Sequence, residues 1–262
     1  MDKLNVYDFI KKDNIAKPLY IKFSLALEMF LKSGLNFDFQ AIILCGSFAK
    51  NRITEVSDID ILILLPEGSK NSQAFKEVVF NDIKFQLFCF TNEELQNSFN
   101  WEINQLDRQR SGLIASGFVI CGDKIIGNEL ISKAIKTYNA KLPLLEVENA
   151  KSMINFIDAQ FPEQMNMEFK RSEYGFMLTL YGMMEKYFHI LHQIHNSPLP
   201  RHKDIDILLS SIPDKECGEL FCKVLIEENN SIKMKYFFEL SYLIKKRLTK
   251  FMELNYPELK VI

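Results

Sequence analysis

The chain has 262 residues, of which 47% are hydrophobic and 25% are charged, and its formal net charge is -2. These values are typical of a folded protein with one or two domains and exclude a disordered chain. The balanced charge gives no indication of a nucleic-acid partner. No apolar run is long enough to predict a signal peptide or a membrane span. The cysteine count is odd and lacks metal-ligand spacing, so we expect free thiols and a cytoplasmic protein.

The first half of the chain carries patterns of both strands and helices. Short apolar runs predict buried strands at residues 41–46, 59–65, 83–90 and 117–123. Helical spacing predicts helices at residues 18–33, 71–79 and 128–138. Thr91 is followed three residues later by Glu94, which is a capping-box pattern. It predicts a helix that begins there and continues through residue 114.

The composition changes after about residue 140. From there on the sequence shows only helical patterns, at residues 148–160, 167–195, 213–228 and 231–254. The segment HNSPLPRHK, residues 195–203, indicates a loop. We therefore predict an α/β (α+β) domain over residues 1–140, followed by an all-α helical-bundle domain over residues 141–262.

The stretch with the clearest chemical meaning is GSFAKNRITEVSDIDILI, from Gly46 to Ile63. It places a Gly-Ser turn after one strand and two aspartates, Asp58 and Asp60, at the start of the next. Alternation along a strand puts both carboxylates on one face, where they repel unless a cation such as Mg²⁺ lies between them. The glycine lets a phosphate approach the backbone, and Ser47 stands where a helix and its N–H groups begin. The alternative is an ordinary pair of surface aspartates at a strand end.

This pattern resembles the signature of the polymerase-β-like nucleotidyltransferases, including the small bacterial transferases that adenylylate aminoglycosides. The resemblance extends to about residue 125 and rests on Gly46, Ser47, Ser57, Asp58 and Asp60. It implies a mixed sheet with flanking helices and a Mg²⁺ or Mn²⁺ ion held by the two aspartates. It also implies that the Gly-Ser turn and Ser57 bind a nucleoside triphosphate. The implied reaction transfers a nucleotidyl group and releases pyrophosphate.

Two positions depart from the family pattern. Asn51 stands where a second glycine is common, but asparagine tolerates left-handed backbone angles. Gln86 stands where the family carries a third carboxylate, and a neutral amide is a poorer metal ligand and cannot act as a base. Glu77 and Asp82 are near in sequence, but we expect them outside the required register. The site could therefore bind metal and nucleotide without efficient transfer, or borrow a carboxylate from the helical domain.

The helical domain offers two weaker candidate sites. His189, His192 and His195 recur at intervals of three residues, so a metal site on one helix face is conceivable. No nearby cysteine or carboxylate completes it, and a partly buried helix is the simpler interpretation. In the loop at 195–203, Pro200 and Lys203 resemble a Pro-x-x-Lys loop of related two-domain transferases, in which the lysine could meet a phosphate. An ordinary solvated lysine is the alternative.

The leading hypothesis is an enzyme that moves a nucleotide, most simply AMP from ATP, to a hydroxyl of a small molecule or a protein. One alternative is a non-catalytic nucleotide-binding or antitoxin-like regulatory module that lost transfer with the third carboxylate. Another is an interaction protein with a vestigial site. The balanced charge argues against long nucleic acid as the acceptor. The acceptor, the nucleotide and the oligomeric state, with a homodimer among the options, stay open.

Overall fold

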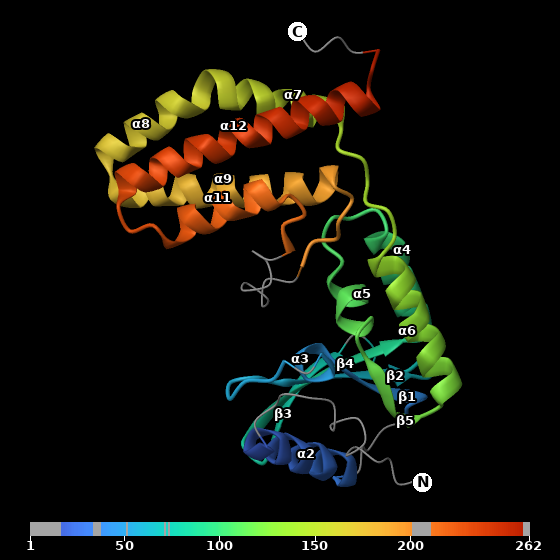
Figure 1. Cartoon of the computed structure of the whole chain (residues 1–262). Coiled ribbons are helices and arrows are strands. Elements are labelled where there is room, and N and C mark those ends of the chain that lie inside the picture. The colour runs from blue at the N-terminus through green and yellow to red at the C-terminus, as the bar shows by residue number, and fades with distance from the viewer. Residues whose placement is uncertain are drawn as a thin grey trace. The chain divides into compact units, whose positions relative to one another are not determined.

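A computed structural model describes residues 17–33, 38–50, 52–70, 72, 74–200 and 211–258 (Figure 1). These residues fall into two compact units. The first takes the described residues up to Asn104 together with Arg108–Ala140, and the second takes Gln105–Asp107 and those from Lys141 onward. Within the described ranges, no helix is long and apolar enough to cross a membrane.

The first unit is built on a five-stranded sheet with the strand order β3-β4-β2-β1-β5. Its strands are β1 (Ala41–Cys45), β2 (Ile59–Leu65), β3 (Ala74–Phe80), β4 (Ile83–Thr91) and β5 (Phe118–Gly122). The strands β2 and β4 pair in parallel, and every other neighbouring pair is antiparallel. The sheet is therefore mixed, which confirms the predicted fold class, and β3 and β5 form its edges.

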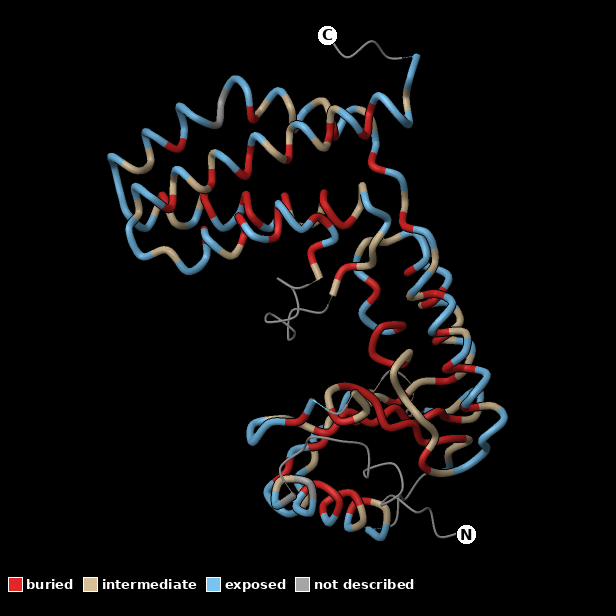
Figure 2. Tube along the Cα trace, in the orientation of Figure 1, coloured by how far each residue is buried: buried red, intermediate tan, exposed pale blue. Residues whose placement is uncertain are grey.

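Helices cover the two faces of this sheet with separate apolar cores. On one face, α2 (Lys17–Lys32) packs Phe23, Leu27 and Phe30 against alternate residues of β2 and β4. On the other face lie α4 (Asn92–Glu102), α5 (Gln109–Ile114) and α6 (Lys124–Tyr138), which pack against β1 and the remaining residues of β2. Buried residues run without interruption through β1 and β2, whereas β3 is half exposed (Figure 2). The central strands are thus fixed from both sides, as their uniformly apolar sequences require.

The helix predicted at residues 71–79 is wrong, because this segment contains the edge strand β3. β3 pairs antiparallel with β4 from Ala74 opposite Cys89 to Phe80 opposite Ile83. The two residues of the connecting turn, Asn81 and Asp82, have φ angles of 50° and 57°. Two-residue hairpin turns with positive φ at both positions match the twist of the flanking strands, and asparagine and aspartate tolerate this geometry. The hairpin therefore decides the conformation of a segment whose own helical pattern is weak.

The capping box at the start of α4 is confirmed. The hydroxyl of Thr91 accepts from the backbone N–H of Glu94 at 3.3 Å, and the Glu94 carboxylate accepts from the N–H of Thr91 at 2.8 Å. The prediction that this helix continues through residue 114 is wrong, because α4 ends at Glu102. The carboxylate of Glu102 accepts from the N–H groups of Arg110 at 2.7 Å and Ser111 at 2.9 Å. These bonds satisfy N–H groups that a new helix, α5, exposes at its start.

The second unit is helical, as predicted for this part of the chain. Its helices are α7 (Val147–Asn155), a π-helical turn η1 (Phe156–Gln160), α8 (Phe161–Arg171), α9 (Glu173–Ile194), α11 (Lys215–Ile226) and α12 (Asn230–Asn255). One apolar core joins them, with Phe176, Tyr187 and Phe237 among its fully buried members. The helix predicted at 148–160 ends in the π turn. Pro162 lacks the N–H that would bond the carbonyl of Asp158, which favours a wider turn there.

The single helix predicted at 167–195 is two helices, α8 and α9. They are divided at Ser172, whose hydroxyl accepts from the N–H of Gly175 at 3.2 Å and so caps the second helix. Asn229 caps α12 in the same way through bonds to Ser231 and Ile232, at the position where the sequence predicts a helix boundary. Residues 195–200 of the predicted loop carry no helix or strand, and the rest of that loop lies outside the described residues.

Candidate functional site

Gly46 and Asp60 are in direct contact at the centre of the sheet. Gly46 follows the last residue of β1, Cys45, which pairs with Asp60 on β2. The φ angle of Gly46 is +69°, and a Cβ atom at this position would lie 1.8 Å from Oδ2 of Asp60. Only glycine fits here, both for its backbone angle and for the space available. The two halves of the sequence signature, the Gly-Ser turn and the aspartate pair, therefore meet in one place.

The Gly-Ser turn opens a short helix, α3 (Gly46–Ala49), as the sequence suggested. The carbonyl of Ser47 accepts from the N–H of Arg52 at 2.9 Å, and the carbonyl of Gly46 accepts from the N–H of Lys50 at 3.2 Å. Ser47 is half-buried. The first N–H groups of a helix have no acceptor within the helix itself. Ser47 and the first N–H groups of α3 therefore follow directly on Gly46, which contacts Asp60.

A second turn fixes the approach to β2. The hydroxyl of Ser57 accepts from the N–H of Thr54 at 2.8 Å and lies 3.0 Å from the Thr54 hydroxyl. The N–H of Ser57 donates to the carbonyl of Thr54 at 3.1 Å. These bonds close a four-residue turn immediately before Asp58. In this structure Ser57 thus orders the loop that carries the first aspartate.

The two aspartates stand at the start of β2. Asp58 is half-buried just before the strand, and Asp60 is 3% exposed within it. Ile59 and Ile61 belong to the core beneath α2, so Asp60 lies on the opposite face, and strand alternation predicts the same face for Asp58. Among the described residues no three acidic, histidine or cysteine side chains gather as a metal site. Two carboxylates suit Mg²⁺, which is usually held by one or two of them and completed by water and phosphate oxygens.

Gln86 lies beside Asp60. The parallel register of β2 and β4 pairs Asp60 with Gln86, and the antiparallel register of β4 and β3 pairs Gln86 with Glu77. Glu77 therefore lies one strand beyond Gln86 and is not itself the register partner of Asp60. Asp82 occupies the hairpin turn, away from this row. Sequence reasoning missed Glu77 because it assigned a helix to this segment. The signal that could have found it is the two-residue turn between two runs of β-branched and aromatic residues.

The other positions singled out in the sequence are Lys203, Asn51 and the histidines of the helical domain. Lys203 and Asn51 lie outside the described residues. His192 is buried, and its Nδ1 lies 3.1 Å from the carbonyl oxygen of Ser197. Burial lowers the pKa of His192, so the ring stays neutral near pH 7. This supports the interpretation of the histidines as parts of a packed helix.

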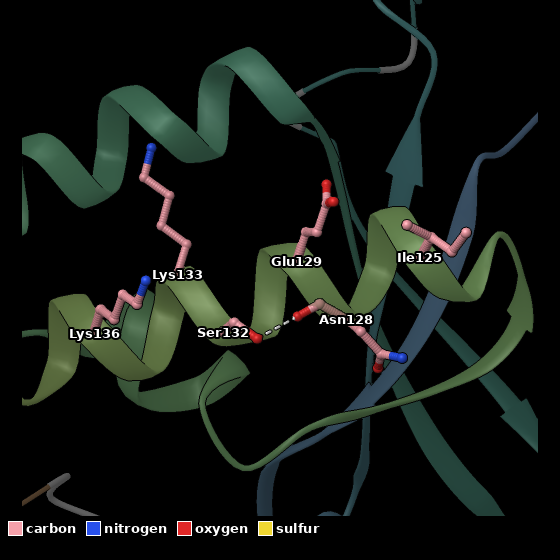
Figure 3. Close-up of a pocket in the computed structure, with 6 residues that line it drawn as sticks. All are labelled: Ile125, Asn128, Glu129, Ser132, Lys133 and Lys136. Atoms are coloured by element: carbon pink, nitrogen blue, oxygen red, sulfur yellow. Dashed lines mark hydrogen bonds between the residues drawn. The ribbon is translucent and has the colours of Figure 1, made fainter.

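A surface hollow along α6 is separate from these residues (Figure 3). All of its lining side chains come from one exposed helix face: Ile125, Asn128, Glu129, Ser132, Lys133 and Lys136. The hydroxyl of Ser132 donates to the carbonyl of Asn128 at 2.8 Å, so it already has an acceptor. A binding site normally needs polar groups that converge from several elements. We assign no function to this hollow.

Comparison with known proteins finds one matching protein family. Residues 31–111 match the family model of the nucleotidyltransferase domain, and this span contains every residue of the sequence signature. No curated protein matches the chain. Among solved structures, a nucleotidyltransferase-like protein from Exiguobacterium sibiricum 255-15 is 14% identical, with a TM-score of 0.37. That match covers 92% of this chain and 81% of the other.

Proposed function

We propose that the chain is a Mg²⁺-dependent enzyme that transfers a nucleotidyl group, a proposal supported by the match of residues 31–111 to the nucleotidyltransferase family model. The donor in this proposal is ATP, the transferred group is AMP, and the acceptor is a hydroxyl of a small molecule or a protein. The observation that carries it is the contact between Gly46 and Asp60, where a Cβ atom would lie 1.8 Å from the carboxylate. This contact brings a phosphate-binding turn against a candidate metal ligand.

The proposed roles follow from where each group lies. Asp58 and Asp60 would hold the metal ion, which neutralises phosphate charge when bound. The backbone and hydroxyl at Gly46 and Ser47 would bind phosphate oxygens. Nucleotidyl transfer depends mainly on positioning and charge neutralisation, and a rigid strand and turn supply both. The buried position of Asp60 keeps water away from one side of the site and so strengthens its interaction with a cation.

Two further residues have proposed roles of different kinds. We assign Ser57 to the nucleotide site through the loop that it orders, since its hydroxyl already accepts a hydrogen bond from Thr54. Lys203 is proposed to contact a phosphate, because its Pro-x-x-Lys sequence resembles that of related two-domain enzymes. Replacing Lys203 with methionine should weaken nucleotide binding about tenfold without affecting the fold.

One observation favours a second candidate function. Gln86 is the residue in register beside Asp60, and its amide cannot accept a proton from an acceptor hydroxyl. A non-catalytic nucleotide-binding or regulatory module would bind Mg²⁺-ATP and release no pyrophosphate. In such a module, Gln86→Asp should create pyrophosphate release where the wild type has none. An enzyme should release pyrophosphate without any substitution.

The deciding experiment is calorimetric titration of the full chain with ATP, with and without Mg²⁺, since it requires no knowledge of the acceptor. We expect magnesium-dependent binding that Asp58→Asn weakens at least about tenfold, because one of two charged ligands is lost. Glu55→Gln is the matched control, because Glu55 is an exposed carboxylate in the same turn. Binding that is indifferent to Mg²⁺ and to Asp58→Asn would reject this site.

Pyrophosphate release then separates the enzyme from the module. We expect wild-type protein to release pyrophosphate from Mg²⁺-ATP once a suitable hydroxyl is present, and Asp60→Asn to abolish it. Release that survives Asp60→Asn would place the chemistry elsewhere. Tight binding with no release under any acceptor would favour the regulatory module.

A further inference from the structure

We propose that Glu77, on the edge strand β3, accepts the proton of the attacking hydroxyl in the proposed transfer reaction. This inference rests on the proposed function. It starts from the row of register partners Asp60, Gln86 and Glu77, which crosses β2, β4 and β3 in that order. Directly paired residues of neighbouring strands lie on the same face of a sheet. Val78 and Phe80 pack toward the core beneath α2, which confirms that Glu77 lies on the other face with Asp60.

Burial decreases along this row toward the edge of the sheet. Asp60 is 3% exposed, Gln86 is half-buried and Glu77 is exposed. The flanking side chains of β3 on the same face, Phe75 and Val79, are 54% and 67% exposed. The core beneath α4, α5 and α6 takes in residues of β1 and β2 and the partly buried Phe88 and Phe90 of β4, and among the described residues it includes none of β3. Within the first unit, an acceptor can therefore reach a nucleotide held at Asp60 from the side of β3.

Of Gln86 and Glu77, only Glu77 can accept the proton of the acceptor hydroxyl. In the transfer step the acceptor oxygen forms a bond to the α-phosphorus, the bond from that phosphorus to the bridging oxygen breaks, and pyrophosphate leaves with that oxygen. The proton of the acceptor hydroxyl must go to a base. Gln86 cannot take it, whereas the Glu77 carboxylate can. The Glu77 carboxylate also forms an ion pair with the ammonium of Lys84 at 2.5 Å.

Glu77 is too far from Asp60 to bind the same metal ion. Neighbouring strands lie about 4.8 Å apart, so the Cα atoms of Asp60 and Glu77 are about 10 Å apart. Among the described residues, no group of three or more histidine, cysteine, aspartate or glutamate side chains could hold a metal ion, which agrees with this separation. The gap is wide enough for a phosphate near Asp60 and a hydroxyl near Glu77. The side chain of Gln86 lies between them, where its amide can orient either group.

The test is pyrophosphate release from Mg²⁺-ATP by the full chain, with water and then glycerol as the acceptor. We expect Glu77→Gln to lower the rate about 100-fold, as loss of a general base does, while the Kd of Mg²⁺-ATP changes less than twofold. In Glu77→Ala, added formate should restore part of the rate, because a free carboxylate can enter the space that is left. Formate should not rescue Glu77→Gln, in which that space is filled. Asp82→Asn, in the turn of the same hairpin, is the control and should leave the rate unchanged.

Each outcome decides between the inference and the proposed function. A wild type that releases pyrophosphate, with Glu77→Gln equally fast, overturns the inference alone. A rate loss in Glu77→Ala that formate does not restore assigns Glu77 a structural role and also overturns it. A wild type that binds Mg²⁺-ATP and releases no pyrophosphate with any hydroxyl acceptor overturns the transfer reaction and the role of Glu77 together.

Discussion

Asp60 lies opposite Gln86 in the parallel register of β2 and β4, so a buried carboxylate and a neutral amide occupy neighbouring positions at the centre of the first unit. Like charges placed directly opposite each other on neighbouring strands destabilise a sheet. The amide therefore avoids a repulsion that a second carboxylate at this position would create in the absence of metal. Substitutions of Gln86 can therefore report the charge next to Asp60.

We predict that Gln86→Asp destabilises the metal-free protein by about 1 kcal/mol, through repulsion between the new carboxylate and Asp60. Saturating Mg²⁺ should reverse most of this loss, because a cation bound there neutralises both groups. Thermal unfolding with and without Mg²⁺ measures the effect. Gln86→Asn, which keeps a neutral amide, is the control and should show no magnesium dependence beyond that of the wild type. An equal response of both variants to Mg²⁺ would contradict a metal at Asp60.

Gly46→Ala should abolish magnesium-dependent nucleotide binding. The new Cβ atom would lie 1.8 Å from Oδ2 of Asp60, so the carboxylate must move. Gly68→Ala is a matched control, since Gly68 has a φ angle of +76° with nothing within 4 Å of an added Cβ. It carries the same backbone strain, about 1 kcal/mol, without the clash. Calorimetric titration with Mg²⁺-ATP should therefore separate the two variants, although both lose stability.

A double variant tests the same contact by stability alone. Asp60→Ala removes the carboxylate that an added Cβ at position 46 would meet. We expect Gly46→Ala to cost clearly less in the Asp60→Ala background than in the wild type, since residues in contact show non-additive effects. Urea unfolding of the four proteins gives the interaction free energy. Additive losses would show that the clash is relieved without movement of Asp60.

Arg108→Met should cost about 3 kcal/mol of unfolding free energy, because it leaves several buried carbonyl groups without a donor. Arg108 is 1% exposed, and its guanidinium donates to the carbonyls of Glu102 at 3.2 Å, Ile103 at 3.0 Å, Tyr138 at 2.9 Å and also Ala140. Burial lowers the pKa of Arg108, and the Glu102 carboxylate opposes this. Arg110→Met is the control, because Arg110 is exposed above the ring of Phe90. Equal losses in the two variants, measured by urea unfolding, would contradict the structural role of Arg108.

Asp214→Asn should reduce stability near neutral pH and have little effect at low pH. Burial raises the pKa of Asp214, but hydrogen bonds from Arg247 at 2.5 Å and from the N–H of Cys217 at 3.0 Å outweigh it, so the net pKa is lowered. A carboxylate with a lowered folded-state pKa adds stability above its unfolded pKa of about 4. That stability is lost as the pH falls through the folded value. Asparagine still caps α11, so the difference isolates the charge.

The expected difference between wild type and Asp214→Asn is about 1 kcal/mol at pH 7, and it should shrink steadily below pH 4. Urea unfolding at several pH values measures it. A difference that stays constant down to the lowest pH would assign the effect to capping geometry, not to charge.

The features that the sequence predicts well depend on residues close together in the chain. The Gly-Ser turn and the capping box at Thr91 each follow from a few neighbouring side chains, and the structure contains both. Strands such as β1 and β2, which are apolar throughout, are also predicted at the right positions. Buried central strands carry an unambiguous pattern, because both of their faces meet a core.

The errors arise where distant residues or single turn geometries decide the conformation. β3 becomes a strand because the positive φ angles of Asn81 and Asp82 pair it with β4, and this pairing alone brings Glu77 into line with Gln86. The long helix predicted at 167–195 is divided by one serine that serves as a cap. Helical periodicity continues across such a break, so a pattern of apolar spacing does not reveal it.

The assignment of residues 105–107 to the second unit limits how the chain can be divided into fragments. Gln105–Asp107 belong to the second unit, although the residues on either side of them belong to the first. No single cut of the chain therefore yields both units whole. A fragment that ends at Ala140 carries three residues whose own unit has been removed, and a fragment that begins at Lys141 lacks them. Assays on an isolated N-terminal piece would describe a damaged protein, and negative results from such a piece would say little about the intact chain.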